Sequence, residues 1–207
     1  MRLLLLLLVA ASIAPAVERV LYTKSFPGSV PAYVSISVDS QGAAEYREAA
    51  DDDRPVRFSV NPREAQTIFD LAAKLNFFKD TLESPAKVAR MGLKTLRFEK
   101  DATAQQTQFN YTDNPDARLL ADWFERVSET EQQRERLERA ARYDKLGVNQ
   151  ALLEVQSGWE RKRLVAPEQL LPLLDRVANN ETYVHMARTR AAALAGQIRA
   201  AETAPTP

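Results

Sequence analysis

The stretch that decides the fold is Val34-Ser35-Ile36-Ser37-Val38, which is followed directly by Asp39-Ser40-Gln41-Gly42. Its apolar residues alternate with serines at a period of two, which is typical of a strand with one buried face. The next four residues favour a turn, and Gly42 can adopt a positive φ at little cost. A second alternating run through Ala44, Tyr46 and Glu48 follows. Together they predict a β-hairpin.

The flanking sequence repeats the alternating pattern. Val20 and Tyr22 precede the break at Pro27-Gly28, and a run of Val56, Phe58 and Val60 follows the acidic stretch Asp51–Asp53. We expect both runs to add strands to the hairpin. A further hairpin is predicted by the alternating residues Leu96, Phe98, Phe109 and Tyr111.

At Asn61, between these predicted strands, the spacing of apolar residues changes from the period of a strand to that of a helix. Asn61 is a favourable N-cap, Pro62 suits the first helical position, and Glu64 has the spacing of a capping box. An apolar stripe at helical spacing follows, formed by Ala65, Ile68, Phe69, Ala72 and Leu75. Strands followed by a helix and then by strands predict an α+β fold, in which an antiparallel sheet is packed by one or two helices.

The second half of the chain predicts helices. Asn114-Pro115 resembles another helix start, and the apolar face that follows consists of Leu119, Leu120, Trp123, Phe124 and Val127. Glu, Gln and Arg dominate residues 129–145, where the only apolar stripe is Leu137, Ala140 and Ala141. This composition predicts a largely solvated helix. We therefore expect an α+β domain over 17–128, a charged helical connector over 129–145, an all-helical subdomain over 146–202 and a disordered tail over 203–207.

Residues 1–16 have the pattern of a cleavable secretory signal. Arg2 precedes the apolar run Leu3–Val9, and Ala14-Pro15-Ala16 fits the small-residue rule of signal peptidase. The alternative, a membrane anchor, needs about 20 apolar residues, more than this run supplies. We expect cleavage after Ala16, a bacterial periplasmic or extracellular protein, and no stable membrane span in the mature chain.

Composition narrows the classes of partner. Lys and Arg together number 28, as do Asp and Glu, so no bulk charge favours nucleic acid. Cysteine is absent, so stability in an oxidising compartment rests on packing and not on disulfides.

The motifs of common catalytic and cofactor sites are missing from this sequence. His185 is the only histidine, and no cysteine is available to share a zinc ion with it. No G-x-S-x-G, G-x-G-x-x-G or Walker pattern is present. Asp51–Asp53 lacks the spacing of an EF-hand, which favours a solvated loop. We therefore predict no metal site and no cofactor, and the sequence assigns no catalytic residue.

Aromatic and basic residues in the helical half have two interpretations each. Trp123 and Trp159 occupy stripe positions of helices, which favours burial in a core over a sugar platform or an interface anchor. Tyr183, Arg188 and Arg190 would form a surface patch, although ordinary solubility also explains the two arginines. Paired carboxylates for glycoside hydrolysis stay an open alternative, because acids are abundant in the chain.

The segment Phe26–Tyr33, together with the turn and strand after it, resembles the opening of an uncharacterised bacterial exported family. That family has the signature C-x-G-x-C-P-x-Y, then a strand, a D-G turn and a second strand ending in Tyr. The matching residues here are Gly28, Pro31, Tyr33, Gly42 and Tyr46. Phe26 and Val30 replace the two cysteines, so no redox or disulfide role transfers. The resemblance covers the first half of the mature chain and implies no known activity.

Two classes of function follow from these observations. The first is a non-enzymatic module that binds another protein or an envelope component through the sheet edge, a loop or the helical hairpin. The alternative is a carboxylate-dependent hydrolase. An exposed apolar patch would favour the first, and a cleft holding acids with perturbed pKa values would favour the second. A third hypothesis gives the C-terminal helices a role in assembly.

Overall fold

The computed structural model describes residues 17–203. The predicted signal peptide, residues 1–16, and residues 204–207 of the predicted tail lie outside this range. Thr203, the first residue of that tail, is the last residue of a helix. Between residues 17 and 203, no helix has the length and hydropathy that crossing a bilayer requires.

Six antiparallel strands form one sheet in the order β4-β3-β2-β1-β5-β6. Their bounds are β1 (Arg19–Ser25), β2 (Tyr33–Asp39), β3 (Ala43–Arg47), β4 (Val56–Ser59), β5 (Leu93–Lys100) and β6 (Thr103–Phe109). The predicted hairpin is β2–β3, in which Ile36 pairs with Tyr46. Gly42 has a φ of 86°, and a Cβ atom there would lie 2.7 Å from the carbonyl oxygen of Val60. The turn therefore requires glycine.

Five α-helices and two short 3₁₀ helices complete the chain. Their bounds are α1 (Pro62–Lys74), η1 (Asn76–Phe78), α2 (Pro115–Tyr143), α3 (Val148–Glu160), η2 (Pro167–Leu170), α4 (Leu171–Ala178) and α5 (His185–Thr203). Both predicted asparagine caps are present. The Asn61 side chain accepts from the backbone N–H of Arg63, and that of Asn114 accepts from Asp116 and Ala117.

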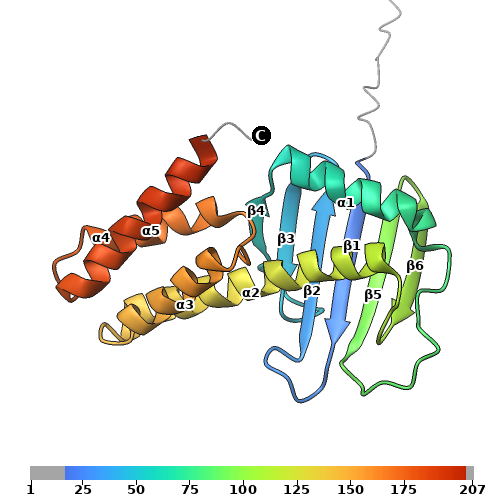
Figure 1. Ribbon diagram of the computed structural model, residues 1–207, viewed down its shortest axis with the longest axis horizontal. Helices are drawn as coiled ribbons and strands as arrows, with labels where there is room; N and C mark the ends of the chain where they lie inside the picture. Colours follow the sequence, from blue (N-terminus) through green and yellow to red (C-terminus); the bar gives the residue numbers. More distant parts are fainter. Residues whose placement is uncertain (1–16, 204–207) are drawn as a thin grey trace, which may run out of the picture.

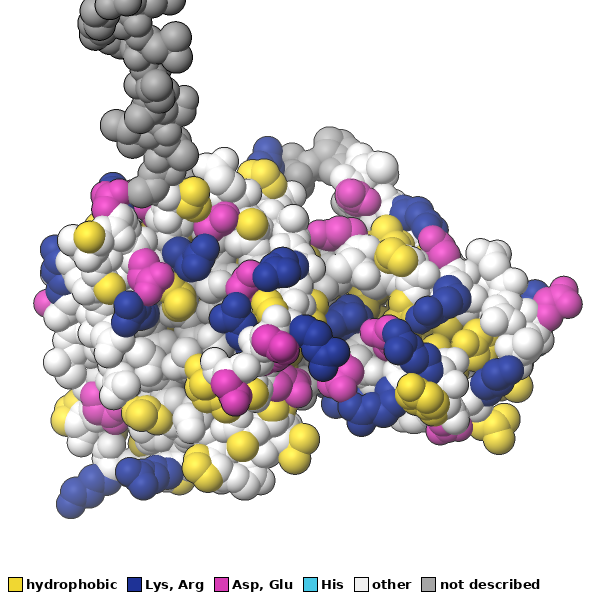
Figure 2. Space-filling view, turned by 180° about the vertical axis from the view of Figure 1, so that it is seen from behind, with side chains coloured by type: hydrophobic (Ala, Val, Ile, Leu, Met, Phe, Trp, Pro, Cys, Tyr) yellow, Lys and Arg dark blue, Asp and Glu magenta, His cyan; other side chains and the backbone are white. Residues whose placement is uncertain are grey.

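Two hydrophobic cores lie on either side of the middle of α2. In the first, α1 and the N-terminal half of α2 cover one face of the sheet (Figure 1), and the apolar strand residues point toward them. In the second, the C-terminal half of α2 packs with α3, α4 and α5. On the other face of the sheet, the outward side chains of β2 are Tyr33, Ser35, Ser37 and Asp39, which are partly exposed. The view from behind shows charged side chains on the surface of this half (Figure 2). The predicted α+β fold with a helical C-terminal region is confirmed.

The segment 129–145 is helical as far as Tyr143, but the prediction that it is largely solvated needs correction. It continues α2 without a break, so the expected boundary at residue 128 falls inside one helix. Leu137 is fully buried and Ala141 is buried in the second core, while Thr130 and Glu131 are buried near the centre of the helix. A narrow apolar stripe was sufficient because α3 packs directly on it and α4 and α5 extend the same core. The division into separate domains stays a prediction.

Candidate functional site

A cleft of about 550 Å³ lies between the sheet half and the helical half of the molecule. One wall is the turn from β4 into α1, which includes Val60 and Glu64. The other wall is formed by the end of α3, by η2 and by the C-terminal turn of α5. The two walls come from opposite ends of the chain and meet because α2 links the two cores (Figure 1).

The cleft combines an apolar floor with an acidic rim. Its apolar lining is made of Val60, Trp159, Leu164, Ala166 and Ile198, of which Trp159 and Leu164 are only partly buried. Glu64, Glu168 and Glu202 stand on the rim, and Arg63 is the one basic side chain that lines it. Within residues 17–203, none of these three carboxylates forms an ion pair closer than 4.0 Å. The rim therefore carries an excess of negative charge.

The acidic side chains of the rim influence one another. The pKa of Glu168 is raised above its ordinary value, first because its carboxyl loses solvent on the cleft side and then because Glu202 and Glu64 add negative charge nearby. Desolvation and like charges both disfavour the ionised form of a carboxyl group. A cation placed in the cleft would oppose the second effect and lower the pKa of Glu168.

The loop that carries Leu164 and Glu168 is held in place by side chains of α2. Val165 donates its backbone N–H to the hydroxyl of Thr130 over 3.0 Å, in a fully buried bond. Ala166 then adopts a left-handed conformation with a φ of 46°, which turns the chain into η2. Two bonds from Arg163 to the Glu129 carboxylate, of 2.9 and 2.7 Å, tie the start of the same loop to α2. One wall of the cleft is thus fixed by polar contacts.

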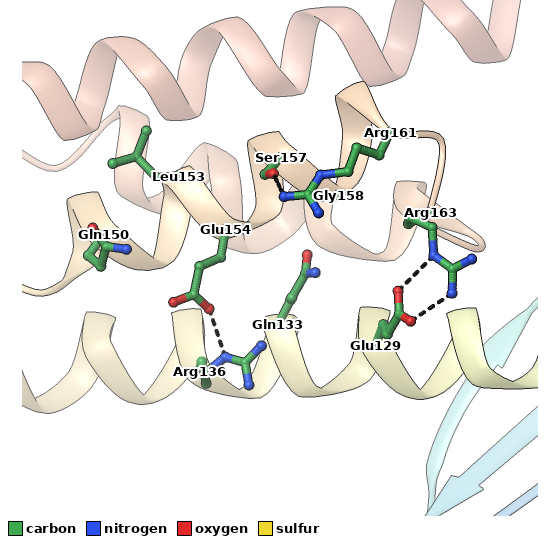
Figure 3. A pocket seen from close by; sticks show the side chains of 10 residues that line it. All are labelled: Glu129, Gln133, Arg136, Gln150, Leu153, Glu154, Ser157, Gly158, Arg161 and Arg163. Carbon is green, nitrogen blue, oxygen red and sulfur yellow. Dashed lines mark hydrogen bonds and ion pairs between the residues drawn. The ribbon is translucent and has the colours of Figure 1, made fainter. Parts of the chain in front are cut away.

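A second groove, of about 380 Å³, separates α2 from α3 (Figure 3). Ion pairs bridge it at both ends: Arg136 binds Glu154 at 2.9 Å, and Arg163 binds Glu129. Figure 3 shows Gln133 standing between these two pairs. A Cβ atom on Gly158 would lie 2.8 Å from the end of the Leu164 side chain and 2.9 Å from the Gln133 side-chain oxygen, so both side chains rest directly on the glycine. These charges neutralise one another, and we interpret this groove as a lock between α2 and α3.

The residues that the sequence singled out do not converge on one site. His185 opens α5 and lines a shallow groove with Met186 and Gln156. In the stretch from 17 to 203, no three His, Cys, Asp or Glu side chains gather as metal ligands would. Asp51–Asp53 lies in the loop after β3, where a carboxylate oxygen of Asp52 accepts from the backbone N–H of Arg54.

The aromatic residues have different environments. Trp123 is buried in the first core, as predicted. Trp159 packs against the second core and also lines the cleft, so it is only partly buried. Tyr183 does not join Arg188 and Arg190 in a surface patch, because it is buried and donates its hydroxyl to the carbonyl of Ala141.

Sequence reasoning missed the acidic rim. Glu64 was noted only for its spacing at a helix start, and Glu168 and Glu202 were not distinguished from the other acids. They belong to α1, η2 and α5, and no local pattern relates these three elements. Only the tertiary arrangement brings them to one opening.

The segment that resembles the exported family forms the loop between β1 and β2. There the backbone N–H of Phe26 donates to the carbonyl of Ala32 over 2.9 Å, which closes the loop. This geometry is compatible with many hairpin sequences. Comparisons with protein-family models, with curated proteins and with solved structures find no match for this chain.

Proposed function

We propose that this protein is an exported, non-enzymatic module of the bacterial cell envelope, and that its cleft binds a peptide segment carrying both apolar and basic side chains. The observation that carries the proposal is the set of three carboxylates without an ion-pair partner, placed on the rim of an apolar cleft. Apolar contact supplies affinity, and the acidic rim selects charge.

The chemistry of the cleft favours a cationic ligand over an anionic or neutral one. A lysine or arginine at the rim would pair with Glu168 and Glu202, where no side chain among residues 17–203 now does so. An aliphatic side chain of the same ligand would contact Trp159 and Leu164, which keep part of their surface exposed. A bound cation lowers the pKa of Glu168, so we expect ligand binding to release protons and to weaken as the pH falls.

The test uses Trp159 as a reporter. Trp123→Phe leaves Trp159 as the only tryptophan in the chain. A synthetic hexapeptide of alternating lysine and leucine is titrated into this variant, and a peptide of alternating glutamate and leucine serves as the charge-reversed control. We expect only the basic peptide to shift the Trp159 fluorescence. Equal responses to both peptides, or no response to either, would contradict the proposal.

Matched variants test whether the change in Trp159 fluorescence depends on the acidic rim of the cleft. Glu168→Gln together with Glu202→Gln removes two charges without changing side-chain size, and we expect it to weaken binding about tenfold or more. Glu135→Gln, an exposed substitution on α2 outside the cleft, is the control and should leave the affinity unchanged. Unfolding midpoints measured for all variants separate lost binding from lost structure.

A carboxylate-dependent hydrolase is the second candidate, and the raised pKa of Glu168 favours it. Such a shift suits a general acid, and a second carboxylate on the same rim would act as the base. We would measure the hydrolysis of a set of aryl glycosides by the wild-type protein and by Glu168→Gln. Turnover that Glu168→Gln abolishes would support the enzyme. If no glycoside of the set is hydrolysed and the basic peptide binds, the results would favour the non-enzymatic binding module.

A further inference from the structure

Exposed apolar side chains gather on two loops at one end of the sheet. Val30 is 96% exposed and Phe26 39%, both on the loop between β1 and β2. Met91 is 57% exposed, with Val88 and Leu93 beside it in sequence and also exposed, where the chain enters β5. Both loops project beyond the ends of the strands at the bottom of Figure 1. We propose that these two loops, 26–32 and 85–93, dock the protein on an anionic lipid surface.

The two loops form one continuous surface. Ser25 pairs with Leu93 at the last position of the β1–β5 ladder. A Cβ atom on Gly92 would lie 3.0 Å from the Cβ atom of Phe26, so the backbone of one loop rests against the side chain of the other. Residues from two separate segments of the chain therefore lie side by side.

Hydrogen bonds hold the loop before β5 in a fixed shape. The side chain of Asn110 accepts from the backbone N–H of Met91 over 2.6 Å and donates to the carbonyl of Ala89 over 3.1 Å. The apolar tip is thus preorganised and does not have to fold on contact. A rigid tip loses less conformational entropy when it enters an interface.

Basic residues surround the apolar tips. Lys87 and Arg90 are exposed and make no ion pair within the part of the chain that the structure describes. No acidic residue occurs between Ser84 and Leu93 or between Arg19 and Tyr33. The lower rim of the sheet half in Figure 2 carries hydrophobic and basic side chains together. The acidic loop Asp51–Asp53 follows β3 at this same end of the sheet, on the far side of β2 from β1. Exposed Glu83 accepts from the backbone N–H of Asn110, so the basic character is local to the two tips and does not extend over the whole end.

A second layer of positive charge lies behind the tips. Lys24 and Lys94 are directly opposite each other in the β1–β5 ladder. The ammonium of Lys24 binds the Glu125 carboxylate at 3.1 Å, whereas that of Lys94 donates to the backbone carbonyl of Asn110 at 3.2 Å. Glu125 and Glu83 are the carboxylates that act on Lys94, so the two lysines behind the tips are balanced by two acids and the unpaired positive charge is that of Lys87 and Arg90.

The combination fits a bilayer interface. Projecting apolar side chains with lysine and arginine around them insert shallowly among lipid headgroups, and each basic residue near an anionic surface adds to the attraction. A protein partner would need a concave, acidic surface shaped to two separate tips. This surface is distinct from the cleft, so a molecule docked by the loops would still present the cleft to a ligand.

The experiment is cosedimentation of the mature chain, residues 17–207, with vesicles of phosphatidylcholine alone or of phosphatidylcholine mixed with phosphatidylglycerol. We expect binding to the mixed vesicles that weakens with added salt, and little binding to the neutral ones. Lys87→Glu with Arg90→Glu should lower the partition coefficient about tenfold or more. Val30→Ser with Met91→Ser should also lower it about tenfold, because two apolar tips no longer insert.

Controls make the result decisive. Lys145→Glu and Met186→Ser change charge and exposed apolar surface on the helical half, and they should leave vesicle binding unchanged. Thermal melts confirm that all variants are folded. Equal binding to both kinds of vesicle, no binding to either, or equal losses in the loop variants and the controls would each overturn the proposal. The peptide titration at the cleft is independent of every one of these outcomes.

Discussion

The ring of Tyr22 in β1 stacks face to face on the ring of Phe124 in α2, with centroids 5.0 Å apart and planes inclined by 3°. Trp123 meets Phe124 edge-on at the same centroid distance. This contact joins the central strand of the sheet to the helix that continues into the second core. The position of the cleft walls relative to each other therefore depends on this aromatic cluster.

Phe124→Ala should lower the free energy of unfolding by about 3–5 kcal/mol, because the ring is fully buried and its removal leaves a cavity. Leu119→Ala on the same helix is the matched control. Leu119 is 61% exposed, and its loss should change stability by less than about 0.5 kcal/mol. Urea denaturation measures both. Similar midpoints for the two variants would show that the register of α2 on the sheet is wrong.

Leu137→Ala should cost about 2–5 kcal/mol, since Leu137 is fully buried among α3, α4 and α5. Arg139→Ala, which removes only an exposed i,i+4 ion pair with Glu135, should cost about 0.5 kcal/mol or less. Amide exchange provides a second measurement. Backbone amides near Leu137 should exchange as slowly as those near Trp123, whereas a solvated connector would exchange faster.

Glu131 should make the protein less stable as the pH rises. Its side chain is 1% exposed, and burial raises the pKa of the carboxyl although the Arg134 guanidinium opposes the shift. Below the ordinary glutamate pKa the group is protonated in both the folded and the unfolded protein. As the pH rises toward the folded pKa, the unfolded chain releases its proton more readily, so the free energy of unfolding falls.

Glu131→Gln removes this titration. We expect the stability of the wild-type protein relative to Glu131→Gln to decrease as the pH rises above about 4.3, the ordinary glutamate pKa. Glu168, whose pKa is also raised, is present in both proteins, so the comparison isolates Glu131. Glu135→Gln should show no such trend against the wild type. A wild-type stability that stays constant or rises with pH relative to Glu131→Gln would contradict the burial of an ionisable group there.

The strands and helices could be predicted from local patterns because the residues within each element, or next to it, favour that element. The alternation in β2 and the caps at Asn61 and Asn114 are read from a few neighbouring residues. The apolar periodicity of the strands and helices also predicts that the helices pack on one face of the sheet.

The burial of the second half of α2 could not be predicted from local sequence patterns. Leu137 and Ala141 form a narrow stripe, and whether such a stripe is covered depends on α4 and α5, which are far away in sequence. The acidic rim depends on the same long-range packing. Glu168 resembles any exposed glutamate until η2 places it near Glu64 and Glu202.

Export remains a prediction from the first 16 residues. Arg2, the leucine-rich run and the Ala14-Pro15-Ala16 site predict a mature chain that begins at Val17. Intact-mass measurement of the protein isolated from the bacterial envelope or medium should give that start. A cytoplasmic protein that still begins at Met1 would contradict the prediction. It would also contradict the proposal that the protein acts in the cell envelope.

Arg163→Ala should loosen the wall of the cleft more than it lowers global stability. Arg163 makes two bonds to Glu129 and one of 2.7 Å to Asp122, and these carboxylates raise the pKa of its guanidinium. The three groups are each about a third to a half exposed, so solvent screens the network and the expected global loss is only about 1 kcal/mol. The local effect is larger because this network is one of the few polar ties between the loop and α2, with the bond from Val165 to Thr130 and a long bond of 3.5 Å from Arg126 to the carbonyl of Lys162.

The buried amide of Val165 reports on that local effect. It donates to Thr130, so its exchange rate measures how often the loop leaves α2. We expect faster exchange at Val165 in Arg163→Ala, a smaller increase in Arg163→Lys, which keeps the charge but loses the bidentate geometry, and no change in Arg54→Ala. Added salt should narrow the gap between wild type and Arg163→Ala. If Val165 exchanges equally slowly in all four proteins, contacts other than those of Arg163 position the loop. The Arg163 network would then contribute nothing to the shape of the cleft.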